Sequence, residues 1–567
     1  GAVAISGVVA LTLSPVMASA LLRADGHDEG FTGKVNRAFD RLKARYGEWL
    51  GASLNARPAL YTVWVLLSLV GFLMFTQAPK ELAPAEDQGI IFGILETPSN
   101  STLEQVSAYA EMANDAMLSV PEADTTFQIT SPGGGFGGMI VAPYGERDRT
   151  VAQILPEVRE KLAAIPGIRM FPVTPPALPG GGEFPVEFII AATSETEEIL
   201  KVAERLQQKA MESGLFAFPP IIDVKVDKPT AEIVIDREKV AQLGLNLQAV
   251  GADVASAVGG NFVNRFTIAG RSYKVIPQIE RKSRLNPQQI EDLYVTGPNG
   301  QLITVGTFAQ VVERTEPRSL NRFQQLNAVK LSGVSIRPLD EALAFLETEA
   351  AAIMPKGYVY DYTGESRQLR TEGNTFAPAF ALAVLLIFLV LAAQFNSFRD
   401  PLVILLGSVP LAMFGASVFM FLKMPNPEMP FFTDGWTTTL NVYSQVGLVT
   451  LVGLVAKNAI LIVEFANELQ RRGMDKLEAA KEASVTRLRP VLMTTAATVF
   501  GHFPLILVTG AGAQARNSIG LVLVAGMAIG TLFTLFIVPA LYVLLAARHE
   551  AEEDSAELAE LDASAAA

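Results

Sequence analysis

Lys457 is the residue best suited to chemistry, and it lies in the apolar stretch LVGLVAKNAILIVEF, residues 451–465. The amide of Asn458 follows it directly, and no carboxylate lies within one helical turn. A charge inside a membrane helix costs at least about 2.5–3.5 kcal/mol, so such residues usually pair with an opposite charge or mark an ion or proton path. The sequence therefore predicts a paired, functional lysine.

A lysine near a helix end can instead extend its ammonium group to the lipid headgroups. Glu464, near the predicted cytoplasmic end of this span, is seven residues further on, about 10 Å along the axis. Side chains also tilt toward the N-terminus of their helix, which here leads deeper into the membrane. No other predicted span carries an acid in its middle. The partner is thus either absent or outside these 567 residues, and we expect a piece of a longer protein.

A second polar track follows Lys457, in which residues separated by seven, four and four positions share one helix face. Its members are Arg487, Thr494, Thr498 and His502. Arg487 could simply anchor the helix at the cytoplasmic face, and the threonines could bond to their own backbone. His502 is interpreted as an interior histidine with satisfied hydrogen bonds. Together with Lys457, the track favours a water-accessible proton path.

Seven apolar stretches are long enough to cross a bilayer. They run over residues 2–22, 58–78, 376–395, 401–422, 441–465, 490–509 and 519–546. Overall, 50% of the residues are hydrophobic and 18% are charged, which indicates apolar spans combined with soluble domains. The net charge of −13 argues against nucleic-acid binding. The absence of cysteine excludes disulfides and thiolate sites, and three histidines make a multi-histidine metal site improbable.

Basic residues are concentrated in segments 23–57 and 466–489, which places both in the cytoplasm. Residues 31–50 have apolar positions at helical spacing and predict an amphipathic helix lying on the inner leaflet. Counting spans then places the long segment 79–375 outside. The acidic tail that follows Arg548 is predicted to be cytoplasmic and disordered.

The outside segment alternates strand and helix patterns, which favours small split-βαβ (ferredoxin-like) subdomains. Hairpins are expected at 261–279, around Ala269-Gly270, and at 293–305, around Asn299-Gly300. The glycine-rich stretch 131–139 lacks the ending of a phosphate-binding loop, and it is interpreted as a flexible loop that exposes Phe136.

Four motifs together resemble the C-terminal half of a resistance–nodulation–division (RND) efflux permease of the hydrophobe/amphiphile type. They are PAEDQG (84–89), GLVAKNAILIVEFANEL (453–469), RLRPVLMTT (487–495) and TGAGAQARNSIG (509–520). The resemblance extends over essentially the whole chain.

The resemblance implies a polytopic α-helical membrane protein whose seven spans are equivalent to helices six to twelve of the family. Residues 1–22 would be the sixth helix, 23–57 a cytoplasmic linker helix, 58–78 the seventh, 376–546 helices eight to twelve, and 547–567 the acidic tail. The periplasmic α+β region 79–375 would hold ferredoxin-like porter subdomains and a docking subdomain. Their ranges would be 84–183 for the third porter subdomain, 184–227 with 325–370 for the fourth, and 228–324 for docking to the channel.

The resemblance also implies function. Lys457, Asn458, Thr494 and Arg487 match the family's proton relay, whose two aspartates lie on helix four and have no counterpart in this chain. Strand positions that line the family's drug pocket match Phe127 and Ile129, and Phe136 lies in what resembles its switch loop. That loop differs here in glycine placement and length.

By the same resemblance, the protein would be a homotrimeric inner-membrane proton/drug antiporter with no cofactor, no metal and no catalytic residue. It would work with a periplasmic adaptor (membrane fusion) protein and an outer-membrane channel. Alternatives are an RND-type exporter of another cargo, such as a metal ion or lipid, or a membrane-anchored scaffold without transport.

Overall fold

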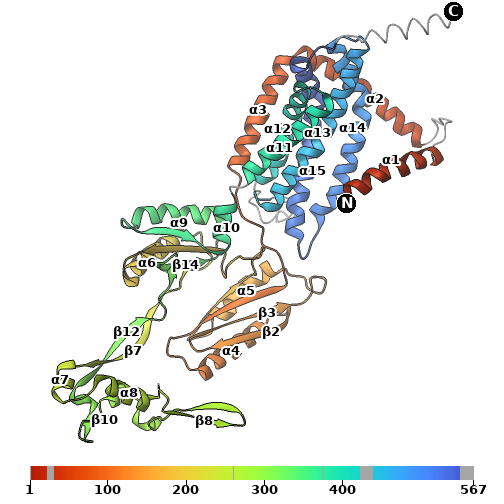
Figure 1. Ribbon diagram of the computed structural model, residues 1–567. Helices are drawn as coiled ribbons and strands as arrows, with labels where there is room; N and C mark the ends of the chain where they lie inside the picture. Colours follow the sequence, from red (N-terminus) through yellow and green to blue (C-terminus); the bar gives the residue numbers. More distant parts are fainter. Residues whose placement is uncertain (1, 22–30, 260, 374–375, 422–437, 550–567) are drawn as a thin grey trace, which may run out of the picture. The chain divides into compact units, whose positions relative to one another are not determined.

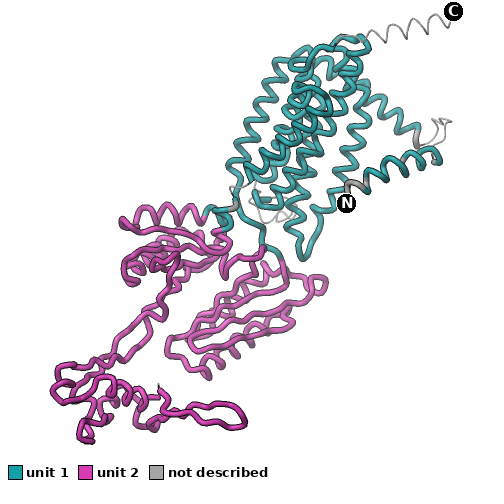
Figure 2. The backbone as a smooth tube through the Cα atoms, viewed as in Figure 1, with its two compact units in different colours: residues 1–86, 338–341, 368–567 teal, residues 87–337, 342–367 magenta. Residues whose placement is uncertain are grey.

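The structure, a computed structural model, describes residues 2–21, 31–259, 261–373, 376–421 and 438–549. The chain forms two compact units, residues 1–86, 338–341 and 368–567 in the first, and residues 87–337 and 342–367 in the second (Figure 2). The first unit is helical, and the second mixes helices with sheets (Figure 1).

Long helices, all of them apolar except the charged α2, build the first unit (Figure 1). They are α1 (Ala2–Leu21), α2 (Phe31–Asn55), α3 (Arg57–Thr76), α11 (Phe376–Phe395), α12 (Arg399–Phe421), α13 (Val442–Arg471), α14 (Lys476–Leu507) and α15 (Ala513–Leu545). Within the described residues, α3 and α11 to α15 are the six that are long and apolar enough to cross a membrane. The first predicted span, 2–22, falls on α1, whose side chains are described only in part, so the count of seven stays a prediction.

Local signals set the ends of α13 and α14. Asn441 begins α13 with a capping box, in which its side chain and that of Ser444 each accept from the other residue's backbone N–H at 2.9 Å. After α13, Gly473 adopts a left-handed φ of 89°, a conformation that glycine tolerates at a helix C-terminus. Asp475 then caps α14. α13 continues past residue 465, the predicted end of its span, and α14 begins before residue 490, the predicted start of its span, so most of the basic segment between them is helical.

Small residues let α12 and α15 pack closely. A Cβ added at Gly407 would lie 2.7 Å from a methyl carbon of Val538, and one at Gly530 would lie 3.0 Å from the Cα of Ala412. In a lipid bilayer the hydrophobic effect does not drive helices together, because lipid tails are as apolar as the side chains. Van der Waals contacts between closely packed backbones stabilise the pair instead. The helices α12, α13 and α15 consequently form the buried centre of the bundle.

The second unit begins with a four-stranded antiparallel sheet in the order β2-β3-β1-β4. Its elements are β1 (Ile90–Glu96), α4 (Leu103–Leu118), β2 (Ala123–Ser131), β3 (Gly134–Val141), α5 (Val151–Ala163) and β4 (Arg169–Val173). This is the element order of a split βαβ unit. Ile91, Leu95 and Met139 on one face of the sheet pack in a core with α4 and α5.

The glycine-rich stretch contradicts the prediction of a flexible loop. Residues 134–141 form the inner strand β3, paired with β1 and β2, and only Pro132 and Gly133 lie in the turn that precedes it. Glycine disfavours strands, which explains the error. Two positions of β3 nevertheless have no room for a side chain. A Cβ at Gly138 would lie 2.5 Å from the carbonyl oxygen of Ile91, and one at Gly135 would lie 2.7 Å from that of Ile129.

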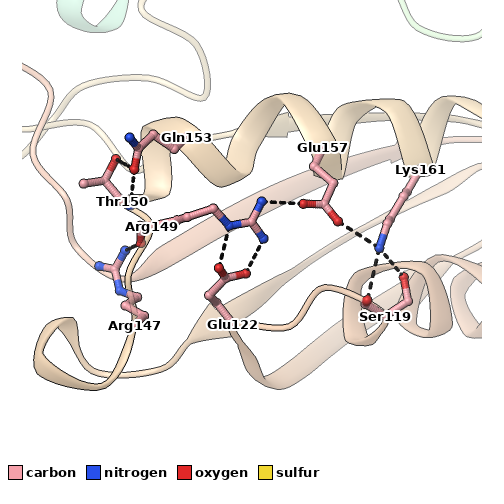
Figure 3. Close-up of polar contacts among 8 residues, drawn as sticks. All are labelled: Ser119, Glu122, Arg147, Arg149, Thr150, Gln153, Glu157 and Lys161. Atoms are coloured by element: carbon pink, nitrogen blue, oxygen red, sulfur yellow. Dashed lines mark hydrogen bonds and ion pairs between the residues drawn. The ribbon is translucent and has the colours of Figure 1, made fainter.

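A charged network ties α5 to the end of α4 (Figure 3). The Arg149 guanidinium donates to both oxygens of Glu122, at 2.5 Å each, and to Glu157 at 2.7 Å. Lys161 pairs with Glu157 at 3.1 Å and donates to Ser119. Hydrogen bonds from Arg149 hold the pKa of the Glu122 carboxyl and that of Glu157 below their ordinary values.

Acid is therefore expected to destabilise this subdomain. A carboxyl whose pKa is lower in the folded than in the unfolded state stabilises the fold above about pH 4.3, and that contribution disappears as pH falls through the folded pKa. Glu122→Gln should lower the thermal unfolding midpoint at pH 7 and reduce the further fall of that midpoint as pH drops below about 4.3. The matched control is Glu198→Gln, at an exposed site on α6. An unchanged pH dependence in Glu122→Gln would contradict the assignment.

A second sheet of the second unit has the order β13-β14-β5-β15, with β6 paired to β14. Its elements are β5 (Val186–Ala192), α6 (Thr196–Glu212), β6 (Ile221–Ile222), β13 (Arg322–Phe323), β14 (Leu326–Gly333), α9 (Leu339–Ile353), β15 (Val359–Tyr362) and α10 (Gly364–Glu372). The chain leaves this sheet after β6 and returns at β13.

The excursion is a separate antiparallel ribbon with its own core. It comprises β7 (Val226–Ile235), α7 (Arg237–Gln242), α8 (Leu247–Val258), β8 (Asn264–Ile268), β9 (Arg271–Val275), β10 (Tyr294–Thr296), β11 (Leu302–Thr304) and β12 (Ala309–Pro317). Both predicted hairpins are confirmed, as β8–β9 and β10–β11. Ala269 and Gly270 have φ values of 49° and 76°, as a tight hairpin turn requires.

Candidate functional site

Asn458 lies at the centre of a small polar cluster inside the helical bundle. Its amide nitrogen donates to the hydroxyl of Thr495 on α14 at 3.0 Å and to that of Thr531 on α15 at 3.2 Å. The two hydroxyls are 3.3 Å apart, and all three side chains are buried. The cluster therefore joins three apolar helices at one point through hydrogen bonds that water cannot replace.

Lys457 faces the other way. Successive helical residues are rotated by 100°, and the rotation from Asn458 back to Lys457 leads out of the bundle, whereas Ala459 on the other side stays buried. Lys457 lies on an exposed stripe of α13, and among the described residues it forms no ion pair or hydrogen bond. The stripe consists of Val446, Thr450, Gly453, Lys457 and Glu464. The structure thus separates two neighbours that the sequence grouped together.

Thr494 and Arg487 also lie apart from the polar cluster. The Thr494 hydroxyl donates to the carbonyl of Val491 on its own helix at 3.2 Å, which is the back-bonding alternative. The Arg487 guanidinium lies 4.6 Å from the ring centroid of Phe465 on α13, a cation–π contact. Its Nε is buried without a partner in the described part of the chain. Neither residue bonds to Lys457 there.

A second buried polar cluster was missed by the sequence reasoning. Asp400, near the start of α12 and 1% exposed, accepts from the amide of Asn467 at 3.1 Å. Tyr542 donates to Asn467 at 2.6 Å and accepts from Gln470 at 2.5 Å. The other oxygen of Asp400 is buried without a partner among described residues. An acid in a first helical turn is an ordinary feature, so the sequence carries no signal of this burial.

In the second unit, the sheet of β1 to β4 carries an aromatic cluster on the face away from α4 and α5. Phe92 on β1 lies 6.3 Å from Phe127 and 5.2 Å from Phe136, and the last two are 6.0 Å apart, measured between ring centroids. Ile129 pairs with Phe136 across β2 and β3, and it is largely exposed. The structure brings all three predicted pocket residues together and adds Phe92. Alternation of side chains along β1 could have identified it.

The glycines of β3 keep this face accessible. Gly134 and Gly138 flank Phe136 at alternate positions and present no side chain. Phe136 consequently remains 38% exposed although it lies in an inner strand. Such a half-exposed aromatic surface suits an apolar or amphiphilic molecule.

Comparison with known proteins gives one consistent result. The family described as the AcrB/AcrD/AcrF family matches residues 1–546. The chain is 37% identical over 558 residues to an uncharacterized transporter of Haemophilus influenzae, covering 97% of this chain and 53% of that protein. It is 29% identical over 573 residues to the multidrug export protein AcrF of Escherichia coli K12, covering 96% and 53%. It is 28% identical over 574 residues to the multidrug/solvent efflux pump membrane transporter MepB of Pseudomonas putida, covering 97% and 53%. The chain spans about half the length of the curated relatives it matches.

Proposed function

The chain belongs to the AcrB/AcrD/AcrF family of RND permeases, and on that premise we propose that it forms part of a proton-driven exporter of amphiphilic compounds. The observation that carries this proposal is Lys457, exposed on an apolar span without a partner in the described residues. An uncompensated charge there costs about 2.5–3.5 kcal/mol, so a carboxylate partner is expected in the complete protein. That partner would belong to the relay aspartates that the family resemblance implies.

The attraction between the Lys457 ammonium group and this carboxylate would couple proton binding to a change in the bundle. Protonating the partner carboxylate removes its attraction for the Lys457 ammonium group, and this changes the relative stability of two arrangements of the bundle. Asn458 holds α13 to α14 and α15 through Thr495 and Thr531, so a shift of α13 is expected to move these helices together. The proton gradient supplies the energy, and no bound cofactor takes part in this scheme.

Cargo recognition is assigned to the aromatic cluster of Phe92, Phe127 and Phe136, with Ile129 beside it. Aromatic rings offer a large apolar area with little side-chain entropy to lose, which favours varied amphiphiles over one shaped ligand. We place the protein in the inner membrane as a trimer that works with an adaptor protein and an outer-membrane channel. In that setting 79–375 would be periplasmic, with the porter and docking subdomain limits given above.

Deleting the gene and measuring susceptibility to a panel of drugs, solvents, metal ions and lipophilic dyes tests this function. Increased sensitivity to amphiphilic drugs and dyes supports the proposal. Sensitivity restricted to metal ions would instead favour another cargo, and an unchanged panel would favour a protein without export activity.

Phe136→Ala is expected to weaken binding of a fluorescent aromatic amphiphile about 3- to 10-fold. Each aromatic contact contributes about 0.5–1.5 kcal/mol beyond its buried area, which sets this range. Fluorescence polarisation with the purified protein measures the change. Ile140→Ala serves as the control, since Ile140 lies on the same strand and is partly exposed but pairs with Ile90 outside the cluster. Equal effects of the two substitutions would contradict a specific role for the aromatic cluster.

A further inference from the structure

The helix α2 presents one flank that nothing in the described chain covers. Its opposite face is fixed in the bundle, where Tyr46, Leu50 and Leu54 are buried and the Tyr46 hydroxyl donates to the carbonyl of Leu535 at 2.6 Å. With the rotation of α2 set in this way, Leu42 remains 43% exposed and Trp49 61% exposed. These two residues are seven positions apart and therefore lie on one side of the helix.

Charge is distributed unevenly around α2. At 100° per residue, Arg45 lies beside Trp49 on the exposed flank, and Arg41 follows next to it. The acids Asp40 and Glu48 line a different surface, a groove between α2 and α14 that also contains Lys481. The exposed flank thus combines large apolar side chains with cations. Asp40 lines the groove toward α14, and Glu48, seven residues from Arg41 and so on nearly the same side of the helix, lies at the boundary between the groove and the flank.

Arg41 and Arg45 form no ion pair with any described residue. The only hydrogen bond of the Arg41 side chain there goes from its Nε to the carbonyl of Arg37, at 3.2 Å. Two guanidinium groups one helical turn apart repel each other unless an anion neutralises them. The flank therefore has positive charge available for an external anionic partner.

The position of α2 in the chain indicates which partner this is. α2 ends at Asn55, and α3, long and apolar enough to cross a membrane, begins at Arg57. Figure 1 shows α2 at the end of the bundle where α3 begins. Tryptophan prefers the membrane–water interface, and guanidinium groups bind phosphate through paired hydrogen bonds.

We propose that the flank formed by Arg41, Leu42, Arg45 and Trp49 binds anionic phospholipid headgroups of the leaflet from which α3 starts. Leu42 and Trp49 enter the boundary between headgroups and acyl chains, and the two arginines contact the phosphates. Anionic phospholipids of this leaflet thus act as ligands of the protein.

A fluorophore at position 42 tests the proposal in the complete protein, reconstituted in phosphatidylcholine bilayers. This chain contains no cysteine, so Leu42→Cys provides a unique label within it. Brominated phosphatidylcholine should quench the label, and brominated phosphatidylglycerol should quench it at a lower lipid fraction. A label at Ala44→Cys, in the groove against α14, should be quenched by neither. Absence of quenching at position 42 would overturn the proposal, because water or protein would then cover the flank.

Charge variants separate headgroup recognition from simple contact with lipid. Arg41→Gln with Arg45→Gln should reduce the preference for phosphatidylglycerol about tenfold or more, since each basic residue near an anionic surface contributes roughly fivefold. Lys43→Gln removes one charge on the groove side and should retain most of the preference. Equal quenching by the two lipids in the unmodified protein would overturn the proposal, and so would equal losses in the arginine and lysine variants.

Discussion

Replacing Lys457 by methionine is expected to reduce efflux by the complete protein to the level of a strain that lacks it. Methionine keeps a long flexible side chain but removes the ammonium group, so an acid that loads and releases protons would lose its counter-charge. The relevant measurements are drug accumulation in cells and proton uptake by proteoliposomes. Assembly should remain unchanged, because Lys457 is exposed and forms no ion pair or hydrogen bond with any residue that the structure describes.

Lys481→Met is the matched control for this experiment. Lys481 is an exposed lysine near the start of α14, in the cytoplasmic segment predicted from the basic residues. Its substitution removes the same charge outside the apolar region and should leave efflux within about twofold of the original, as expected for a solvated charge. Normal efflux in Lys457→Met with intact protein would refute the proton role of the residue.

The second large effect is expected at the buried cluster around Asp400. Asn467→Leu removes the only described donor to the Asp400 side chain, and the Tyr542 hydroxyl loses the acceptor of its hydrogen bond. Leaving a buried acceptor without its partner costs about 1–3 kcal/mol, and more when the acceptor is charged. The thermal unfolding midpoint of the purified protein should fall by several degrees as a result.

A double substitution distinguishes this cause from a simple packing defect. Asp400→Leu together with Asn467→Leu removes both partners, and replacing both members of a buried polar pair by apolar residues is often nearly neutral. The double variant should therefore be more stable than Asn467→Leu alone. Additive losses in the two single variants and the double variant would show that the hydrogen bond does not carry the effect.

Features that depend on residue type and short spacing could be predicted from the sequence. Six apolar helices follow from runs of about 20 hydrophobic residues, and the two hairpins follow from Ala-Gly and Asn-Gly turns. Lys457 stood out because an ammonium group in such a run is energetically anomalous. None of these inferences needed information about which elements contact each other.

The glycine-rich strand shows where local preference fails. β3 needs glycine at two positions because the carbonyl oxygens of Ile91 on β1 and Ile129 on β2 approach Gly138 and Gly135 too closely for a Cβ. The contact with Ile91 joins strands that α4 and β2 separate in the sequence, whereas Ile129 lies in the strand just before β3. Glycine's poor strand propensity by itself predicts that no strand forms here. The same pairing assembles Phe92, Phe127 and Phe136 into one surface.

By itself, the sequence determined the membrane character of the chain, the position of Lys457 within a span, and the residue classes available for a polar path. Only the tertiary structure decided that Asn458 bonds to Thr495 and Thr531, whereas Thr494 bonds to its own helix. It also decided that Asp400 is buried. The physical reason is rotation: neighbouring helical residues point 100° apart, and only the packing of other helices determines which direction is interior.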